Sequence, residues 1–123
     1  MTIRIYYEDT DAGGIVYHTR YINFCERARS EIFFERGMMP SQGNESGFVV
    51  RHIDADFLAT SKLGDLLNVR SEIQTLKSSS MTLLQEVWRE DVKVFSMQVL
   101  LVYIDRGRLR RIPKDFLDIF DTL

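Results

Sequence analysis

The stretch between residues 7 and 21 holds the side chains best suited to chemistry in this chain. Asp11 supplies a carboxylate, which can attack a carbonyl carbon directly or take a proton from water as a general base. His18 stands where a helix is expected to begin, and its ring can orient a group, transfer a proton or only cap that helix. Since Glu8 and Asp9 lie within three positions of Asp11, the three acids also fit a solvated turn.

Two consecutive glycines, Gly13 and Gly14, precede the expected helix. Glycine lets the backbone approach a ligand closely, and the first N–H groups of a helix lack partners within the helix. Such N–H groups and the helix dipole can stabilise negative charge on a carbonyl oxygen, although glycine pairs also occur in ordinary turns. Neither a Gly-x-Gly-x-x-Gly fingerprint nor a Walker lysine is present, so no nucleotide cofactor is expected.

A metal centre is not expected. The acids near Asp11 have only His18 as a nearby nitrogen ligand, and the regular ligand spacings of zinc and calcium sites are absent from the sequence. His52 lies in an alternating segment without an evident partner, so we assign it a structural position. Cys25 falls in an apolar helical pattern, which favours a buried thiol over a nucleophile.

Hydrophobic periodicity predicts the elements that must position these residues. A first strand is expected over residues 3–7 and a long helix over 19–36, closed by Gly37 and Pro40. A loop at 39–47 precedes segments of period two. These predict strands over 48–57, 67–75, 81–90 and 93–105, the last two joined by a tight turn at 91–92, before a short helix over 113–120. One long helix with a mostly antiparallel sheet is an α+β arrangement in which the sheet wraps the helix.

Composition limits the function classes. The 123 residues suit a single domain over 1–123, and a formal charge of −2 gives no general attraction for nucleic acid or an anionic membrane. The longest strongly apolar run, residues 99–104, is far below the roughly 20 residues needed to span a bilayer. No signal-like segment opens the chain, so a soluble cytoplasmic protein without a transmembrane segment is expected.

Two further groups of residues offer alternatives. Lys77 precedes a serine run, Ser78–Ser80, that reads as a bend able to hold a phosphate, and a local basic cluster surrounds Arg110 and Arg111. That cluster is either a solvated strand end or an anion site. Apolar residues near the helix end form either core or an acyl pocket: Phe33, Phe34, Met38, Met39 and Phe48.

The pattern Tyr7-x-x-x-Asp11-x-x-Gly14-Ile15-Val16-Tyr17-His18-x-x-Tyr21, with Phe24-Cys25-Glu26-Arg27-Ala28-Arg29 after it, resembles the 4-hydroxybenzoyl-CoA thioesterase family. Within that family it is most similar to the Tol–Pal-associated acyl-CoA thioesterases. Segments 53–59 and 108–113 share the resemblance, which spans nearly the whole chain. It implies a hot-dog fold, in which a curved antiparallel sheet of about five strands wraps a long central helix.

The resemblance also implies a hydrolase that splits acyl-CoA into free acid and CoA without a cofactor. Asp11 would be the nucleophile or general base, the helix N-terminus at His18 would polarise the thioester carbonyl, and Tyr7 would be a third catalytic residue. Substrate contacts would come from Gly14, Ile15, Val16, Tyr17, Lys77, Arg110 and Arg111. A homo-oligomer is implied, either a dimer or a dimer of dimers (a homotetramer), with the active site between subunits.

The sequence departs from some relatives in having Lys77 as the only basic residue where they carry several. That leaves open whether the acyl group arrives on CoA or on acyl carrier protein. Two other functions stay open: a 3-hydroxyacyl thioester dehydratase, for which Glu26 on the helix would be the acid, and a binding or scaffold protein that retains the fold without catalysis.

Overall fold

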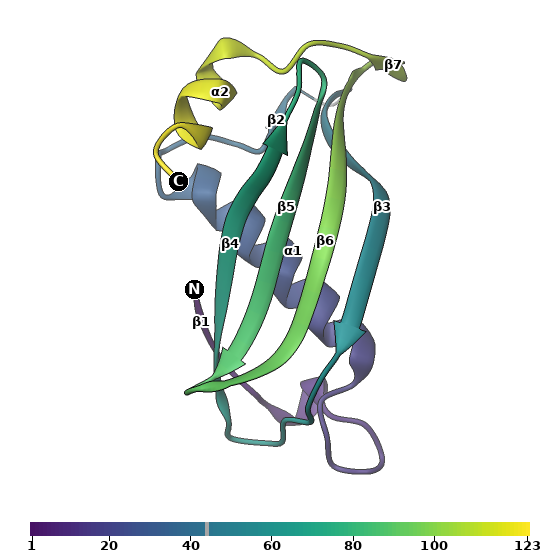
Figure 1. Cartoon of the computed structure of the whole chain (residues 1–123), viewed down its shortest axis with the longest axis vertical. Coiled ribbons are helices and arrows are strands. Elements are labelled where there is room, and N and C mark those ends of the chain that lie inside the picture. Colours follow the sequence, from purple (N-terminus) through teal and green to yellow (C-terminus); the bar gives the residue numbers. More distant parts are fainter. Residues whose placement is uncertain (44) are drawn as a thin grey trace.

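The computed structural model describes residues 1–43 and 45–123 and shows one curved sheet wrapped around one long helix (Figure 1). The helix is α1 (His18–Phe34), and the shorter α2 (Lys114–Phe120) closes the chain. A 3-10 turn, η1 (Tyr7–Asp9), precedes α1. The strands are β1 (Thr2–Arg4), β2 (Ser41–Gln42), β3 (Ser46–Phe57), β4 (Leu66–Leu76), β5 (Ser80–Arg89), β6 (Val92–Asp105) and β7 (Arg108–Leu109).

The sheet is antiparallel throughout, in the order β1-β4-β5-β6-β3-β2, and β7 pairs with β6. The five strands β1 and β3–β6 form the curved hot-dog sheet, while β2 and β7 are two-residue additions. The α+β hot-dog prediction is therefore confirmed. Within the described residues, no helix has the length and apolar character needed to cross a bilayer.

The apolar stripe of α1 explains why the helix lies against the concave face of the sheet. Tyr21, Phe24, Cys25 and Ala28 recur every three or four residues and are all buried. They meet the inward side chains of β4, β5 and β6, which alternate with outward ones as period two requires. The apolar stripe predicted from the sequence is therefore the face of α1 that packs against the sheet.

Helix α2 covers the C-terminal end of α1. Its Phe116 ring contacts the ring of Phe33 on α1 at 5.1 Å and lies 5.9 Å from that of Phe48 on β3. Phe120 adds ring contacts to the same two residues, so aromatic packing seals this end of the core. The opposite end of α1 has no such cover (Figure 1).

Most boundaries differ from the sequence prediction by one or two residues, and three differences change the local structure. The first strand ends at Arg4 rather than residue 7, because the Tyr6 N–H donates to the Asp9 carboxylate at 3.0 Å and folds the chain into η1. The predicted loop at 39–47 contains β2, which pairs with the start of β3. The β5–β6 turn centres on Glu90, whose φ of 54° lies in the left-handed region, one residue earlier than predicted.

Strand β3 has one free edge. It pairs with β6 along nearly its whole length, but on its other side β2 reaches only Ser46 and Gly47. The apolar side chains of Val50 and Phe57 are 47% and 50% exposed on this strand. Unpaired strand edges are templates for a further strand, so this edge is the natural place for a second chain to add to the sheet.

Candidate active site

Asp11 sits in a tight turn that its own carboxylate stabilises. Its Oδ1 accepts the Gly13 N–H at 2.8 Å and the Ile15 N–H at 3.4 Å, while the Gly14 N–H donates to the Asp11 carbonyl at 3.0 Å. Gly14 adopts a φ of 81°, a conformation that costs glycine little and other residues more. The turn thus fixes the carboxylate by one oxygen, and Oδ2 has no partner within the described residues.

The turn is anchored to the body of the protein on both sides. Thr10 and Val16 form an antiparallel bridge across its base, and Ile15 forms another with Lys62. The Val16 N–H also donates to the Ser61 carbonyl at 2.8 Å, and the Val16 side chain is 4% exposed. Since Asp11 directly follows one side of the base and α1 begins just beyond the other, the carboxylate is held near the start of the helix.

The N-terminus of α1 is uncapped. Tyr17 occupies the cap position without a side-chain hydrogen bond, and the first turn carries no acidic residue. Within the described residues, the backbone N–H groups of His18 and Thr19 have no hydrogen-bond acceptor. Free N–H groups at the positive end of the helix dipole are suited to stabilising an oxyanion.

The His18 ring is exposed but held between aromatic neighbours. Its centroid lies 4.6 Å from that of Tyr17 and 5.9 Å from that of Phe57, in an edge-on contact with the end of β3. No hydrogen bond joins the His18 ring to Asp11 in the part of the chain that is described. The arrangement therefore brings the backbone start of α1 and the Asp11 turn together, while the imidazole packs against Phe57.

The three adjacent acids have different environments. Asp9 is 4% exposed, accepts the Tyr6 N–H and lies 3.8 Å from the Arg20 Nε. Arg20 also donates to the Glu8 carbonyl at 2.8 Å, which ties the 3-10 turn to α1. Glu8 and Asp11 are exposed. The sequence grouped the three together, but the structure makes Asp9 a supporting residue and leaves Asp11 accessible.

The remaining residues predicted near Asp11 differ in how far their side chains are exposed. Tyr7 and Tyr17 are 81% and 46% exposed, and Ile15 is 38% exposed. Val16, by contrast, has its side chain in the core, so it can offer a ligand only its backbone. The structure brings these residues into one loop but shows no hydrogen bond from the Tyr7 hydroxyl within the described residues.

The predicted basic residues lie elsewhere. The Ile112 N–H donates to the Ser78 carbonyl at 2.8 Å, which sets Arg111 beside the turn that follows Lys77. This turn, between β4 and β5, is at the opposite end of the sheet from the Asp11 loop (Figure 1). Since β4 has 11 residues, the separation along the strand is roughly 35 Å at about 3.3 Å per residue. One chain cannot bring both groups to the same part of one substrate.

The lone thiol takes no part in this site. Cys25 is fully buried under the sheet, and burial raises the pKa of its thiol to about 12. It is therefore protonated near neutral pH and not nucleophilic. Among the described residues, no group of three His, Cys, Asp or Glu side chains is placed to hold a metal ion.

With this geometry established, comparison with known proteins identifies the family. A sequence model described as the thioesterase superfamily matches residues 13–96, more than half of the chain. The chain belongs to the thioesterase superfamily. Membership makes it an enzyme that hydrolyses thioesters, and the matched range begins just after Asp11, so Tyr7 and Asp11 lie outside it.

Individual members of the superfamily resemble the whole chain. It is 37% identical to a protein named acyl-CoA thioesterase YbgC from Helicobacter pylori, over an alignment of 135 positions covering 100% of both chains. It is 35% identical to the acyl-CoA thioester hydrolase YbgC of Escherichia coli, covering 91% of this chain and 87% of that protein. The crystal structure of a probable thioesterase from Bartonella henselae superposes with a TM-score of 0.84 at 30% identity, covering 92% of this chain and 97% of the other.

Two contacts around the site were not predicted from the sequence. Arg20 supports the 3-10 turn, and Phe57 supports His18, yet each acts on a partner brought close only by folding. Phe57 stands at the end of a segment with clear period two, which predicted its strand but not its neighbour. For Arg20 the sequence offers no signal, because charged residues in the first turns of a helix are usually solvated.

Proposed function

We propose that this protein hydrolyses acyl-CoA thioesters at Asp11, with the first backbone N–H groups of α1 binding the carbonyl oxygen. The observation that supports this most directly is an exposed carboxylate, fixed by its own turn, beside a helix start whose His18 and Thr19 N–H groups have no acceptor in the described part of the chain. The names of the two YbgC relatives supply the acyl-CoA substrate class.

The reaction needs little beyond these groups. Asp11 either attacks the thioester carbon, giving an anhydride that water then opens, or takes a proton from the attacking water. Negative charge then grows on the carbonyl oxygen, where the free N–H groups and the helix dipole stabilise it. The CoA thiolate leaves without strong acid assistance, because a thiol is far more acidic than an alcohol. Tyr7 and the rim residues Gly14, Ile15 and Tyr17 would contact the bound ester.

The substrate's phosphates require a second chain in this proposal. Lys77, Arg110 and Arg111 lie a strand's length from Asp11 in one protomer. Antiparallel pairing of two copies along the free β3 edge would bring the basic residues of one copy towards the Asp11 loop of the other. We therefore propose a cytoplasmic homodimer, or a dimer of dimers, with each site shared between two subunits.

The dehydratase alternative has less structural support. It needs an acid on α1 close to a histidine, but Glu26 lies eight positions beyond His18, about 12 Å along the helix axis. Its carboxylate instead accepts a hydrogen bond from Ser30 at 2.8 Å. Release of an enoyl product without free thiol from a 3-hydroxyacyl thioester would favour this alternative over hydrolysis.

The deciding experiment measures thiol release from acyl-CoAs of short, medium and long chain and from one aromatic acyl-CoA. Asp11→Asn should lower turnover by about 10²–10⁴-fold if Asp11 is a general base, and by more if it is the nucleophile. Asp91→Asn, an exposed aspartate in the β5–β6 turn, is the matched control and should keep full activity. Full activity in Asp11→Asn would refute the mechanism.

The panel also separates the other candidates. If only acyl groups carried on acyl carrier protein are hydrolysed, the proposed reaction stands but its carrier is acyl carrier protein rather than CoA. Saturable binding without turnover of either carrier would support the scaffold reading instead.

A complementation test addresses the shared site. One inactive variant carries Asp11→Asn, and the other carries Lys77→Ala, Arg110→Ala and Arg111→Ala. If each site combines Asp11 of one chain with the basic residues of the other, unfolding and refolding the two variants together should restore activity in the mixed dimers. If mass spectrometry confirms mixed dimers but their thiol release does not recover, Asp11 and the basic residues do not act together in one shared site.

A further inference from the structure

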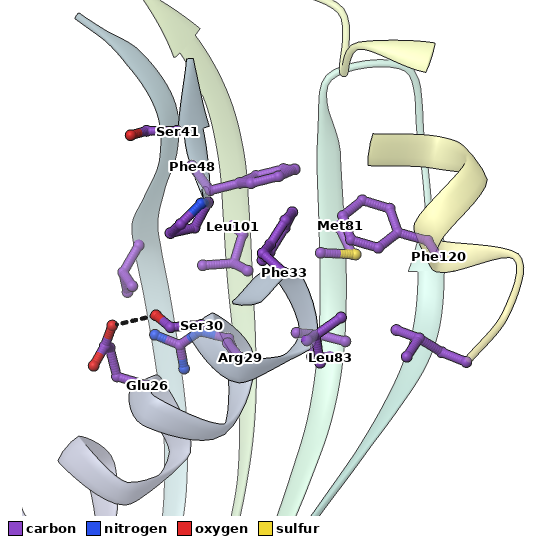
Figure 2. A pocket seen from close by; sticks show the side chains of 14 residues that line it. Glu26, Arg29, Ser30, Phe33, Ser41, Phe48, Met81, Leu83, Leu101 and Phe120 are labelled. Carbon is purple, nitrogen blue, oxygen red and sulfur yellow. Dashed lines mark hydrogen bonds between the residues drawn. The ribbon is translucent and has the colours of Figure 1, made fainter. Parts of the chain in front are cut away.

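A cavity of about 290 Å³ lies towards the C-terminal end of α1 (Figure 2). It is open on one side and is lined by the second half of α1, residues 40–41, strands β3, β5 and β6, and the C-terminal end of the chain from Phe120 to Leu123. Most of its wall is apolar, formed by Phe33, Phe48, Met81, Leu83, Leu101 and Phe120. Its volume is about twice that of an engineered 150 Å³ cavity that binds benzene, so it can hold an acyl chain or a substituted ring.

One end of the cavity is polar. Arg29, Glu26 and Ser30 gather there, on successive turns of α1, away from the rings of Phe48 and Phe120 (Figure 2). Ser30 Oγ donates to the Glu26 carboxylate at 2.8 Å, which directs that acid to its own helix. No carboxylate of the described residues lies within ion-pair distance of Arg29. The cavity is thus amphiphilic, with a half-buried cation at one end that forms no close ion pair in the described part of the chain and feels Glu26 only from a longer distance.

The Arg29 guanidinium is held in place from beneath. Its Nη1 donates to Gln85 Oε1 at 2.9 Å, and Gln85, a residue of β5, is completely buried. The Gln85 amide is itself fixed, since Nε2 donates to the Cys25 carbonyl and to Ser71 Oγ, both at 2.9 Å. One edge of the guanidinium is therefore committed to the core, and its other N–H groups have no acceptor among the described residues.

Burial makes an anion more favourable beside the Arg29 guanidinium. Desolvation lowers the pKa of Arg29 from its ordinary value, which means that the charged form is less well stabilised than it is in water. A carboxylate placed against the open N–H groups would supply a directly bonded counter-charge in a planar, two-bond geometry. A thioester carbonyl is neutral and would gain much less from the same position.

We propose that this cavity binds a free carboxylic acid with a short apolar tail, its carboxylate on Arg29 and its tail among the aromatic rings. Arg29 lies about 16 Å along the helix axis from His18, so the acid would occupy a place separate from the Asp11 turn of the same chain. The proposal does not depend on hydrolysis, although the ligand belongs to the class of acids that thioester hydrolysis releases.

The first test uses the wild-type protein and two probes of equal length, octanoate and octanamide, titrated by calorimetry. Hydrogen bonds to a charged group are strong, so octanoate should bind about 10- to 100-fold more tightly than the neutral amide. Equal affinities, or no binding of octanoate, would overturn the proposal without any variant being needed.

The second test locates the carboxylate. Arg29→Gln keeps an amide donor for Gln85 Oε1 but removes the charge, so the preference for octanoate should disappear in a protein that still melts cooperatively. Arg27→Gln changes an exposed arginine of the same helix and should keep the preference. A preference that persists in Arg29→Gln would contradict the assignment, and if that variant does not fold, the two-probe comparison on wild type decides.

A third measurement separates this site from the active site. Octanoate should still bind Asp11→Asn, and in preference to octanamide, since Arg29 supplies the cation and the Asp11 turn of the same chain is far from the cavity. Loss of binding in that variant would mean that the acid occupies the Asp11 site, and the proposal would fail. If octanoate binds as expected but no acyl thioester is hydrolysed, only the proposed function fails.

Discussion

The two ends of α1 are built in opposite ways. At the N-terminal end the helix starts without a capping side chain, and an exposed turn carries Asp11 beside it. At the C-terminal end α2 covers the helix, and Phe116 and Phe33 join a cluster of packed rings. One end leaves polar groups available, whereas the other removes apolar surface from water.

The difference shows how a small domain can maintain a reactive site. An uncapped helix start forgoes roughly 1 kcal/mol that a serine or aspartate cap would supply. Burial of large aromatic side chains at the other end contributes several times that amount per residue. Apolar burial along α1, from Tyr21 and Phe24 near its start to Phe33 near its end, therefore offsets the missing cap, and substitutions at the open turn and in the covered cluster should have separable effects.

The largest effect on stability is expected at the covered end. Phe116→Ala removes a ring that is 1% exposed and contacts Phe33, Phe48 and Tyr103. We expect the free energy of unfolding to fall by about 3–5 kcal/mol. Urea denaturation measures it, and Phe34→Ala, which truncates a ring 46% exposed, should cost under about 1 kcal/mol as the control.

The expected independence of the two ends of α1 is contradicted if Phe116→Ala loses thiol release at a temperature where it is still folded. Activity per folded molecule should stay close to wild type, because the Asp11 turn has no contact with α2. A loss there would show that the two ends are coupled.

An intermediate effect is expected at Asp9, which belongs to the open end but supports the fold. Asp9→Ala removes the acceptor of the Tyr6 N–H and the partner of Arg20. Stability should fall by about 1.5–3 kcal/mol, as for other buried hydrogen bonds to charged groups. Thermal or urea melts check this value, and Glu8→Ala, an exposed neighbour whose carbonyl still accepts from Arg20, should change little. Equal losses in the two variants would mean that Asp9 has no special supporting role.

The smallest effect should follow His18→Ala. If the backbone N–H of His18 polarises the carbonyl, that group survives the substitution, and thiol release should fall by only about tenfold, or about 1.4 kcal/mol. A side chain that transfers a proton would be worth about 10²–10⁴-fold instead. The rate of thiol release from acyl-CoA distinguishes the two, with Asp91→Asn in the β5–β6 turn as the control expected to retain activity.

Most of the fold was predictable from the sequence because its elements are strongly periodic. The stripe containing Phe24 and Ala28 predicted α1, and alternation predicted β3 to β6 within a few residues. The ends of elements were less predictable because they depend on local hydrogen bonds. Asp9, which turns the chain into η1 and shortens the first strand, is the clearest case.

The candidate site was predictable in its residue types but not in its arrangement. Asp11 and the helix start could be identified from an acid, a glycine pair and a histidine near a change of period. The separation of the Asp11 turn from Lys77 and Arg111 could not, since it depends on which end of the sheet each turn occupies. Phe33 and Phe48, predicted as either core or acyl pocket, do line the cavity near the end of α1, whereas the roles of Arg29 and Gln85 were not predicted.

Gln85 gave a signal that was available in the sequence. Inward positions of β5 are Met81, Leu83, Gln85 and Val87, so the glutamine interrupts an apolar series. A polar residue at such a position requires buried partners. Those partners, Cys25 and Arg29 on α1 and Ser71 on β4, lie at least 14 positions away in the chain, which is why only the folded structure reveals them.

The same glutamine also determines how the protein can misfold. Its hydrogen bonds form only when β5 is in its native register with β4 and when α1 lies at one position along the sheet. A slip of β5 by one residue would turn Gln85 outward, bury a neighbour such as Glu86 without partners and leave Arg29 unsupported. Sliding the helix by one turn would have a similar cost. Gln85 therefore disfavours shifted registers of β5 and shifted positions of α1, which an entirely apolar interface would tolerate.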